Sequence, residues 1–139
     1  MSFKDYRIIP NITRALLFNE QLKVYDKGNQ TRTYCYVTDA ITGFLKVVFK
    51  EENFSIYNIG NDKGEISVLD LVKTTEKVME TKLNYTTTKY PKEYPPDEPQ
   101  RRCPDITNAR INLHYSPKIS LEEGLRRHFL WSKKFAKID

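Results

Sequence analysis

Hydrophobic residues recur every three or four positions in five stretches of the chain, which is the spacing of a helix that buries one face. These stretches predict helices at residues 9–18, from 38 or 39 to 48, from 67 to 79, at 108–113 and from 120 onward. Ser67 with Asp70, and Ser120 with Glu123, have the spacing of a capping box, in which a serine side chain accepts a hydrogen bond from the first turn. We therefore expect these two serines to begin helices.

The second of these helices has a distinct apolar stripe. Thr38 or Asp39 is expected to cap it, because either side chain can accept a hydrogen bond from a free amide of the first turn. The stripe consists of Ile41, Phe44, Leu45 and Val48. Such a stripe is normally covered by a neighbouring element.

Four stretches alternate polar and apolar residues and are rich in β-branched and aromatic side chains, so they predict strands. Leu22–Tyr25 and Thr31–Val37 flank a segment in which glycine and asparagine permit a positive φ, so we expect them to form a β-hairpin. Two further short strands are expected within residues 53–61 and 82–90. The predicted fold class is α/β (α+β): a small mixed domain with a hairpin, two further strands, about five helices and no complete Rossmann fold.

The composition bounds the domain organisation. The 139 residues are 39% hydrophobic and 29% charged, which favours one globular domain over residues 1–139. No apolar run approaches the roughly 18 to 20 residues that a membrane-spanning helix needs, and the first ten residues lack the apolar stretch of a secretory signal. We therefore expect a cytoplasmic protein. Two cysteines and two histidines indicate neither a metal site nor a disulfide framework.

The charge pattern gives a weak indication of a partner. The formal net charge is +5, but the basic and acidic residues are interspersed, without a basic block. The aromatic residues also do not alternate with Lys and Arg in the manner of a nucleic-acid surface. A small basic nucleic-acid-binding protein is therefore an alternative of low rank.

The chain carries no complete catalytic motif. It contains no Gly-rich phosphate loop after a strand, no Walker sequence, no zinc-protease motif and no Ser or Cys nucleophile signature. Tyr85 and Lys89 match the Tyr-x-x-x-Lys spacing of short-chain dehydrogenase active sites. That pair works on a helix, where residues four apart stack, whereas here it lies in a threonine-rich run that predicts a strand. We expect no catalytic residue in this chain.

The order of segments does carry a signal over nearly the whole chain. The motifs are RIIPNITRAL, VYDKGNQTRTYCYVTDAITGFL, YNIGN, DEPQRRCPDITNAR and YSPKISLEEGL. In this order they resemble the C-terminal, substrate-binding part of extended short-chain dehydrogenases, the NAD-dependent epimerase/dehydratase family. The QTR and DEPQRRCPDI segments are most similar to those of UDP-glucuronate decarboxylases, which are lyases, with dTDP-glucose 4,6-dehydratases and UDP-sugar 4-epimerases as near neighbours.

The resemblance implies a UDP-sugar as ligand and assigns it four residues. Arg32 would bind the diphosphate, and Arg102 would reach the same phosphates or the ribose. Tyr25 would lie at the base, and Asn11 would lie in the helix beside it. A guanidinium suits a diphosphate, since it stays charged and offers a rigid fork of donors. From spacing alone, Arg32 would be a solvated cross-strand partner and Arg102 half of a solvated pair with Arg101.

The resemblance also implies what this sequence lacks. The family's N-terminal half carries the Gly-rich NAD loop and the catalytic Tyr-x-x-x-Lys pair, so this chain alone is expected to hold no cofactor and to be inactive. Residues 38–62 would pack on the missing NAD lobe. We expect a partner chain that supplies this lobe, or self-association through residues 40–60. The alternative to a truncated or separately encoded enzyme half is a stand-alone nucleotide-sugar-binding module.

Overall fold

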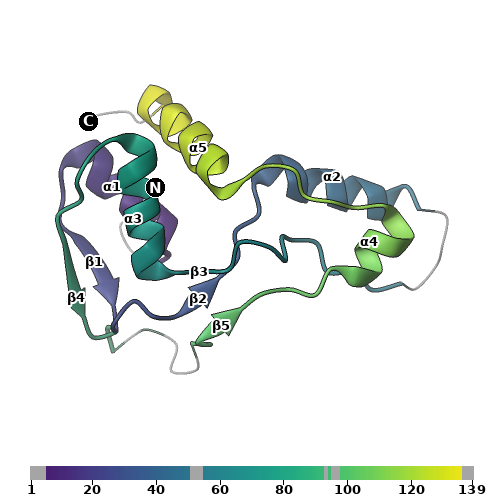
Figure 1. The fold of residues 1–139 in the computed structure, drawn as a ribbon, viewed down its shortest axis with the longest axis horizontal. Helices are drawn as coiled ribbons and strands as arrows, with labels where there is room; N and C mark the ends of the chain where they lie inside the picture. Colours follow the sequence, from purple (N-terminus) through teal and green to yellow (C-terminus); the bar gives the residue numbers. More distant parts are fainter. Residues whose placement is uncertain (1–5, 51–54, 93, 95–97, 136–139) are drawn as a thin grey trace.

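The computed structural model describes residues 6–50, 55–92, 94 and 98–135. It contains five helices and five short strands arranged in two small sheets, so the predicted fold class is confirmed. The elements, in chain order, are α1 (Ile8–Phe18), β1 (Leu22–Tyr25), β2 (Thr31–Arg32), α2 (Val37–Val48), β3 (Ile66–Ser67), α3 (Val68–Met79), β4 (Tyr85–Thr88), β5 (Arg101–Arg102), α4 (Thr107–Leu113) and α5 (Leu121–Phe135). The molecule is elongated, with α1, α3 and α5 at one end and α2 and α4 at the other (Figure 1).

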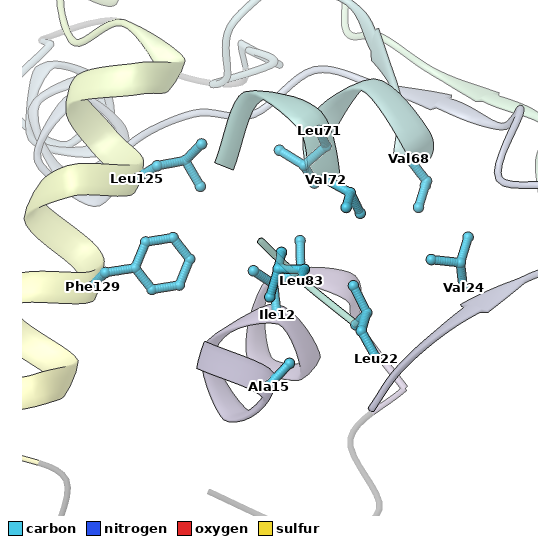
Figure 2. Packing of buried hydrophobic residues seen from close by; sticks show 10 residues of the cluster. All are labelled: Ile12, Ala15, Leu22, Val24, Val68, Leu71, Val72, Leu83, Leu125 and Phe129. Carbon is cyan, nitrogen blue, oxygen red and sulfur yellow. The ribbon is translucent and has the colours of Figure 1, made fainter. Parts of the chain in front are cut away.

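The main core lies at the α1–α3–α5 end, beside a two-stranded parallel sheet of β1 and β4. Leu125 and Phe129 of α5 point toward α3 and α1, where Leu71 and Ile12 are fully buried (Figure 2). The complete cluster is Ile12, Ala15, Leu22, Val24, Val68, Leu71, Val72, Leu83, Leu125 and Phe129. The apolar faces of α1, α3 and α5 therefore pack into one shared core.

The predicted β-hairpin is wrong. β1 pairs in parallel with β4, and the short β2 pairs antiparallel with β3 and parallel with β5. The reason lies in the connection, where the carbonyls of Gly28 and Gln30 accept hydrogen bonds from Leu69 and Val68 at the start of α3. This anchors the connection on α3 instead of letting it turn back along β1. Gly28 has φ +69°, and an added Cβ would lie 2.8 Å from Leu69 Cγ, so glycine suits this close approach.

The predicted helices are present, and both capping serines act as expected. Ser67 Oγ accepts a hydrogen bond from the Asp70 amide at 3.0 Å, and Ser120 Oγ accepts one from the Glu123 amide at 3.2 Å. The predicted cap of α2 is wrong, because its N-cap is Tyr36 and no side chain caps it. Asp39 is instead buried in the first turn of α2.

The strand predicted within residues 53–61 is also wrong for its described part, since residues 55–61 form no strand. Side-chain amides take the place of a partner strand there. Asn108 Nδ2 donates to the Ile56 carbonyl at 2.8 Å, and Asn58 Nδ2 donates to the Asp105 carbonyl at 3.0 Å. Residues 53 and 54 lie outside the described part of the chain. The strand predicted within 82–90 is confirmed as β4.

A second, smaller core lies at the α2–α4 end. Its buried residues are Ile106, Ala109, Leu113 and Tyr115, against which Val47, Tyr57 and Ile59 pack. In the described residues, no helix has the length and apolar character that a membrane crossing requires.

Candidate functional site

A cleft of about 510 Å³ lies where the start of α1, strands β1 and β2, and the segment before β5 meet. Its position follows from the corrected topology, because β2 is held beside β5 and not beside β1. The described residues that line it are Tyr6, Arg7, Ile8, Ile9, Pro10, Lys23, Tyr25, Gln30, Arg32, Tyr34, Val68, Tyr90, Tyr94, Glu98 and Arg102. Four cations and one carboxylate thus surround a partly aromatic cavity, so the cleft favours an anionic ligand.

Arg32 is an inner residue of this cleft, with a side chain that is 14% exposed. Its Nη1 donates to the Thr31 and Gln100 carbonyls at 2.7 and 3.2 Å. Its Nη2 donates to the Pro99 carbonyl at 2.7 Å and to the Glu98 carboxylate. The reading of Arg32 as a solvated cross-strand partner is therefore wrong, since its guanidinium ties β2 to residues 98–100.

Arg102 is the outer arginine. It follows Arg101 in β5, which lies parallel to β2, so Arg32 and Arg102 are register partners. Its side chain is 60% exposed, and its Nη2 lies 3.3 Å from Glu98 Oε2. Arg101 instead pairs with Glu65 at 2.8 Å and does not line the cleft, so the two neighbouring arginines are not equivalent.

Tyrosines form the other wall. The rings of Tyr25 and Tyr90 stack with centroids 5.4 Å apart, Tyr94 lies 4.4 Å from Tyr90, and Tyr6 approaches Tyr25 edge-on at 6.3 Å. Burial raises the pKa of Tyr25, Tyr90 and Tyr94 above the ordinary value. These side chains stay neutral at physiological pH and offer flat apolar faces, which suit an aromatic base.

Two polar atoms of this wall are buried without a hydrogen-bond partner in the described part of the chain: Tyr34 Oη and Gln30 Oε1. Gln30 Nε2 donates to the Tyr90 hydroxyl at 2.8 Å, which links β2 to the tyrosine wall. Burial raises the pKa of Tyr34 to about 12, and nearby Arg32 opposes this rise only in part. Tyr34 therefore carries no negative charge at neutral pH.

The structure brings together three of the four predicted site residues. Tyr25, Arg32 and Arg102 all line the cleft, while Asn11 does not, although its neighbours Ile9 and Pro10 do. Asn11 Nδ2 instead donates to the Arg7 carbonyl at 2.8 Å within α1. The ligand-binding roles of these residues stay predictions.

Sequence reasoning missed Glu98, Tyr90 and Tyr94, which all come from the proline-rich segment between β4 and β5. Glu98 lies in the DEPQRRCPDI motif that supports the resemblance, but neither it nor the two tyrosines is among the four site residues that the resemblance assigns. A signal was present, since Tyr90 and Tyr94 are the aromatic residues of that segment and Glu98 precedes two arginines in the sequence.

Tyr85 begins strand β4 and Lys89 follows its end, so the Tyr-x-x-x-Lys spacing does not lie on a helix. Cys35 and Cys103 are free thiols. No group of three or more His, Cys, Asp or Glu side chains among the described residues could hold a metal ion.

Comparison with known proteins places the chain in a family. Residues 1–128 match the family model described as GDP-mannose 4,6 dehydratase. The chain belongs to this family. The resemblance to NAD-dependent epimerases and dehydratases is thus confirmed at the level of the family.

The curated relatives of this chain include sugar-nucleotide enzymes. UDP-glucuronic acid decarboxylase 5 of Arabidopsis thaliana is 34% identical over 125 residues, which are 90% of this chain and 35% of that protein. UDP-glucuronic acid decarboxylase 1 of Xenopus tropicalis is 30% identical over 136 residues, covering 96% and 30%. The chain therefore spans about a third of the length of these curated relatives.

Solved structures agree with this assignment. UDP-glucuronic acid 4-epimerase from Bacillus cereus, in complex with UDP-glucuronic acid and NAD, matches with a TM-score of 0.82 and 27% identity over 93% of this chain and 40% of that one. UDP-glucose 4-epimerase from Thermotoga maritima, solved with UDP-glucose, matches with a TM-score of 0.84 over 97% of this chain and 42% of that one. At 24% identity, the second match supports the fold alone.

Proposed function

We propose that this chain is the C-terminal, nucleotide-sugar-binding part of an NAD-dependent sugar-nucleotide enzyme, most similar to UDP-glucuronate decarboxylases. The observation that carries the proposal is the cleft in which Arg32 and Arg102 converge beside a tyrosine wall. The relatives add support, because the most similar of those named above are UDP-glucuronic acid decarboxylases.

In this proposal the two arginines bind the diphosphate of a UDP-sugar. Guanidinium groups form charge-assisted hydrogen bonds with phosphate oxygens, and two of them on adjacent strands match the two phosphoryl groups. Arg102 is the more accessible of the pair, while the contacts of Arg32 hold the segment that carries Arg102.

Tyr25 provides a neutral aromatic face for the base, on the opposite wall of the same cleft. Tyrosine rings stack well on planar heterocycles. Asn11 keeps a smaller, indirect role, because its amide bonds the Arg7 carbonyl at the rim of the cleft. It would hold the first turn of α1 against the base.

The β3–α3 junction does not fit NAD. Binding of a dinucleotide at a strand–helix junction requires free amides at the helix N-terminus. The β3–α3 junction is such a junction, but Ser67 already caps it and there is no Gly-rich turn. We propose that the chain alone neither retains NAD nor catalyses decarboxylation, dehydration or epimerisation, and that NAD binds to residues that this sequence does not contain.

The apolar face of α2 supports this division of roles. Ile41, Phe44 and Val48 are 52%, 64% and 57% exposed, and Ile56 is 89% exposed. Soluble proteins normally cover so contiguous an apolar surface. We propose that residues 38–62 pack against an NAD-binding lobe, supplied by a longer form of the protein or by a partner chain. Phe54, which belongs to this range, lies outside the described residues.

Calorimetric titration with UDP tests the proposal. The chain should bind UDP weakly, and Arg102→Ala or Arg32→Ala should each lower the affinity by roughly one to two decades, since a charge-assisted contact with phosphate is lost. Arg126→Ala is the matched control, because Arg126 pairs with Glu123 on α5, away from the cleft. Equal binding by wild type and both cleft variants would remove the arginines from the site.

A second assay addresses the enzyme half and the alternative of a non-catalytic module. The purified chain should show no bound-NAD fluorescence and release no carbon dioxide from UDP-glucuronate. Turnover by the chain alone that is lost in Tyr85→Phe would show that the strand-borne tyrosine is catalytic after all. If adding an NAD-lobe chain restores turnover, the chain is an enzyme half, and if UDP-sugar binding persists without any such partner, the module is favoured.

A further inference from the structure

Glu98 lies between the two arginines of the cleft and contacts both. Its Oε1 accepts a hydrogen bond from Arg32 Nη2, and its Oε2 lies 3.3 Å from Arg102 Nη2. Among the described lining residues it is the single carboxylate. One carboxylate that uses both oxygens to bridge two guanidinium groups occupies the position that a phosphoryl group would need.

The donors of Arg32 leave little room for a second anion. Both of its terminal nitrogens are engaged, Nη1 by the Thr31 and Gln100 carbonyls and Nη2 by Pro99 and Glu98. The three carbonyl contacts are part of the local backbone arrangement and would persist with a ligand bound. The Glu98 carboxylate is the one acceptor of the four that a side-chain rotation can remove.

We infer that Glu98 is a competing anion that determines the selectivity of the cleft, and that a diphosphate binds by displacing its carboxylate from Arg32 and Arg102. The inference rests on the proposed function and adds a requirement to it. A ligand must offer more negative charge to the arginine pair than one carboxylate does. A diphosphate meets this requirement, whereas a nucleoside or a neutral sugar does not.

The surroundings of Glu98 are compatible with such a displacement. Its side chain is 17% exposed, so it is mostly buried but still partly in contact with solvent. The carboxylate lines the same cleft as Tyr94, and after burial of that ring it also contributes to raising the pKa of Tyr94. Moving the carboxylate outward would thus free the arginines and alter the environment of Tyr94 in one step.

The test compares three ligands with the wild-type chain and the isosteric variant Glu98→Gln. UDP, uridine and inorganic pyrophosphate are titrated by calorimetry. Glu98→Gln should bind UDP and pyrophosphate about tenfold more tightly than wild type, because a neutral amide competes less well for a guanidinium than a carboxylate does. Affinity for uridine should be unchanged. Glu98→Ala should follow Glu98→Gln.

Glu65→Gln is the matched control. Glu65 pairs with Arg101 at 2.8 Å just before β3, outside the cleft lining, so the variant makes the same change in net charge near the same strands. It should leave all three affinities unchanged. A gain equal to that of Glu98→Gln would mean that overall charge, and not displacement, strengthens binding, and would overturn the inference.

The remaining outcomes separate this inference from the proposed function. If Glu98→Gln binds UDP as wild type does, or more weakly, Glu98 is no competitor, although UDP binding itself still supports the proposed function. If Glu98→Gln gains affinity for pyrophosphate while neither form binds UDP, Glu98 competes for anions but the nucleotide site is wrong. If no form binds either phosphate ligand, both fail.

Discussion

The two ends of the molecule bury their apolar side chains to different extents. At the α1–α3–α5 end, three amphipathic helices, β1 and Leu83 before β4 contribute to one cluster of ten buried side chains (Figure 2). At the α2–α4 end, the buried cluster has four members, and the stripe of α2 faces solvent. The apolar periodicity of α2 is as regular as that of α3, so the difference lies in the cover and not in the helix.

The face that α2 does bury is a polar and small one. Its buried residues are Asp39 and Gly43. Asp39 Oδ2 accepts hydrogen bonds from the Lys118 and Ile119 amides at 3.0 and 2.9 Å, which joins α2 to the segment before α5. A Cβ on Gly43 would lie 2.5 Å from Ile59 Cγ2, so α2 packs closely against its own chain on that side. An amphipathic pattern therefore predicts a helix but not what covers its apolar face.

The largest contrast should come from matched leucines. Leu71 of α3 is fully buried, so Leu71→Ala should lower the free energy of unfolding by about 2–5 kcal/mol through lost burial and a residual cavity. Leu45 of α2 is 45% exposed, and Leu45→Ala should stay within about 0.5 kcal/mol. Urea unfolding measures both. Similar losses for the two variants would mean that α2 is covered within its own chain.

The attachment of α2 should be the next most sensitive feature. Asp39→Ala removes the acceptor of two partly buried amides and should cost about 1–3 kcal/mol. Hydrogen exchange should show faster exchange at 118 and 119, with the amides of α3 unaffected. The control is Thr38→Ala, since the neighbouring Thr38 is exposed. If the exchange rates at 118 and 119 do not change, Asp39 does not anchor α2.

Helix capping is a smaller difference between the two ends. Ser67 caps α3 with its side chain, whereas α2 begins without a side-chain cap. Ser67→Ala should cost about 1 kcal/mol, because the Asp70 amide loses its acceptor. Ser116→Ala, at an exposed serine between α4 and α5, serves as the control. Thermal unfolding of the two variants provides the comparison. Equal unfolding midpoints would mean that the Ser67 side chain does not stabilise α3.

The smallest effect concerns association through the exposed end. Each 100 Å² of apolar surface that a contact buries favours it by about 2.5 kcal/mol before the cost of association, so weak dimers are expected through residues 40–60. Ile56→Lys should abolish them without altering the stability of the monomer, and Thr86→Lys at the opposite end should not. Light scattering over a concentration series tests this. A wild type that stays monomeric with well-protected amides at 55–60 would contradict it.

The helices were predictable because their signals are local. A capping serine, the apolar spacing and the following turn all lie within about fifteen residues, as in α3 and α5. The strand pairings were not predictable, because β1 pairs with β4 and β2 with β5 through contacts between residues far apart in the sequence. The apparent turn at Gly28 was misleading for the same reason, since its carbonyl is used by α3.

In the candidate site, too, some residues were predictable from the sequence and others depend on the tertiary structure. Arg32 and Arg102 were found through a resemblance, and the parallel pairing of β2 with β5 then accounts for their proximity. Glu98 was not found, because its importance depends on where the proline-rich segment crosses and not on its own residue type. Asn11 was assigned from its position in α1, but a helix presents only some of its residues to one cleft, and Asn11 is not among them.

The parallel pairing of β1 with β4 has a consequence for synthesis of the protein. Leu22 meets Tyr85, so the first strand has to wait for a partner more than sixty residues further along the chain. Closing so long a loop is entropically costly, and folds dominated by such distant contacts form slowly. On the ribosome, α1 and β1 would emerge well before β4, and α5 would complete the main core last. During that interval the apolar residues of α1 and β1 lack the partners that bury them in the folded chain.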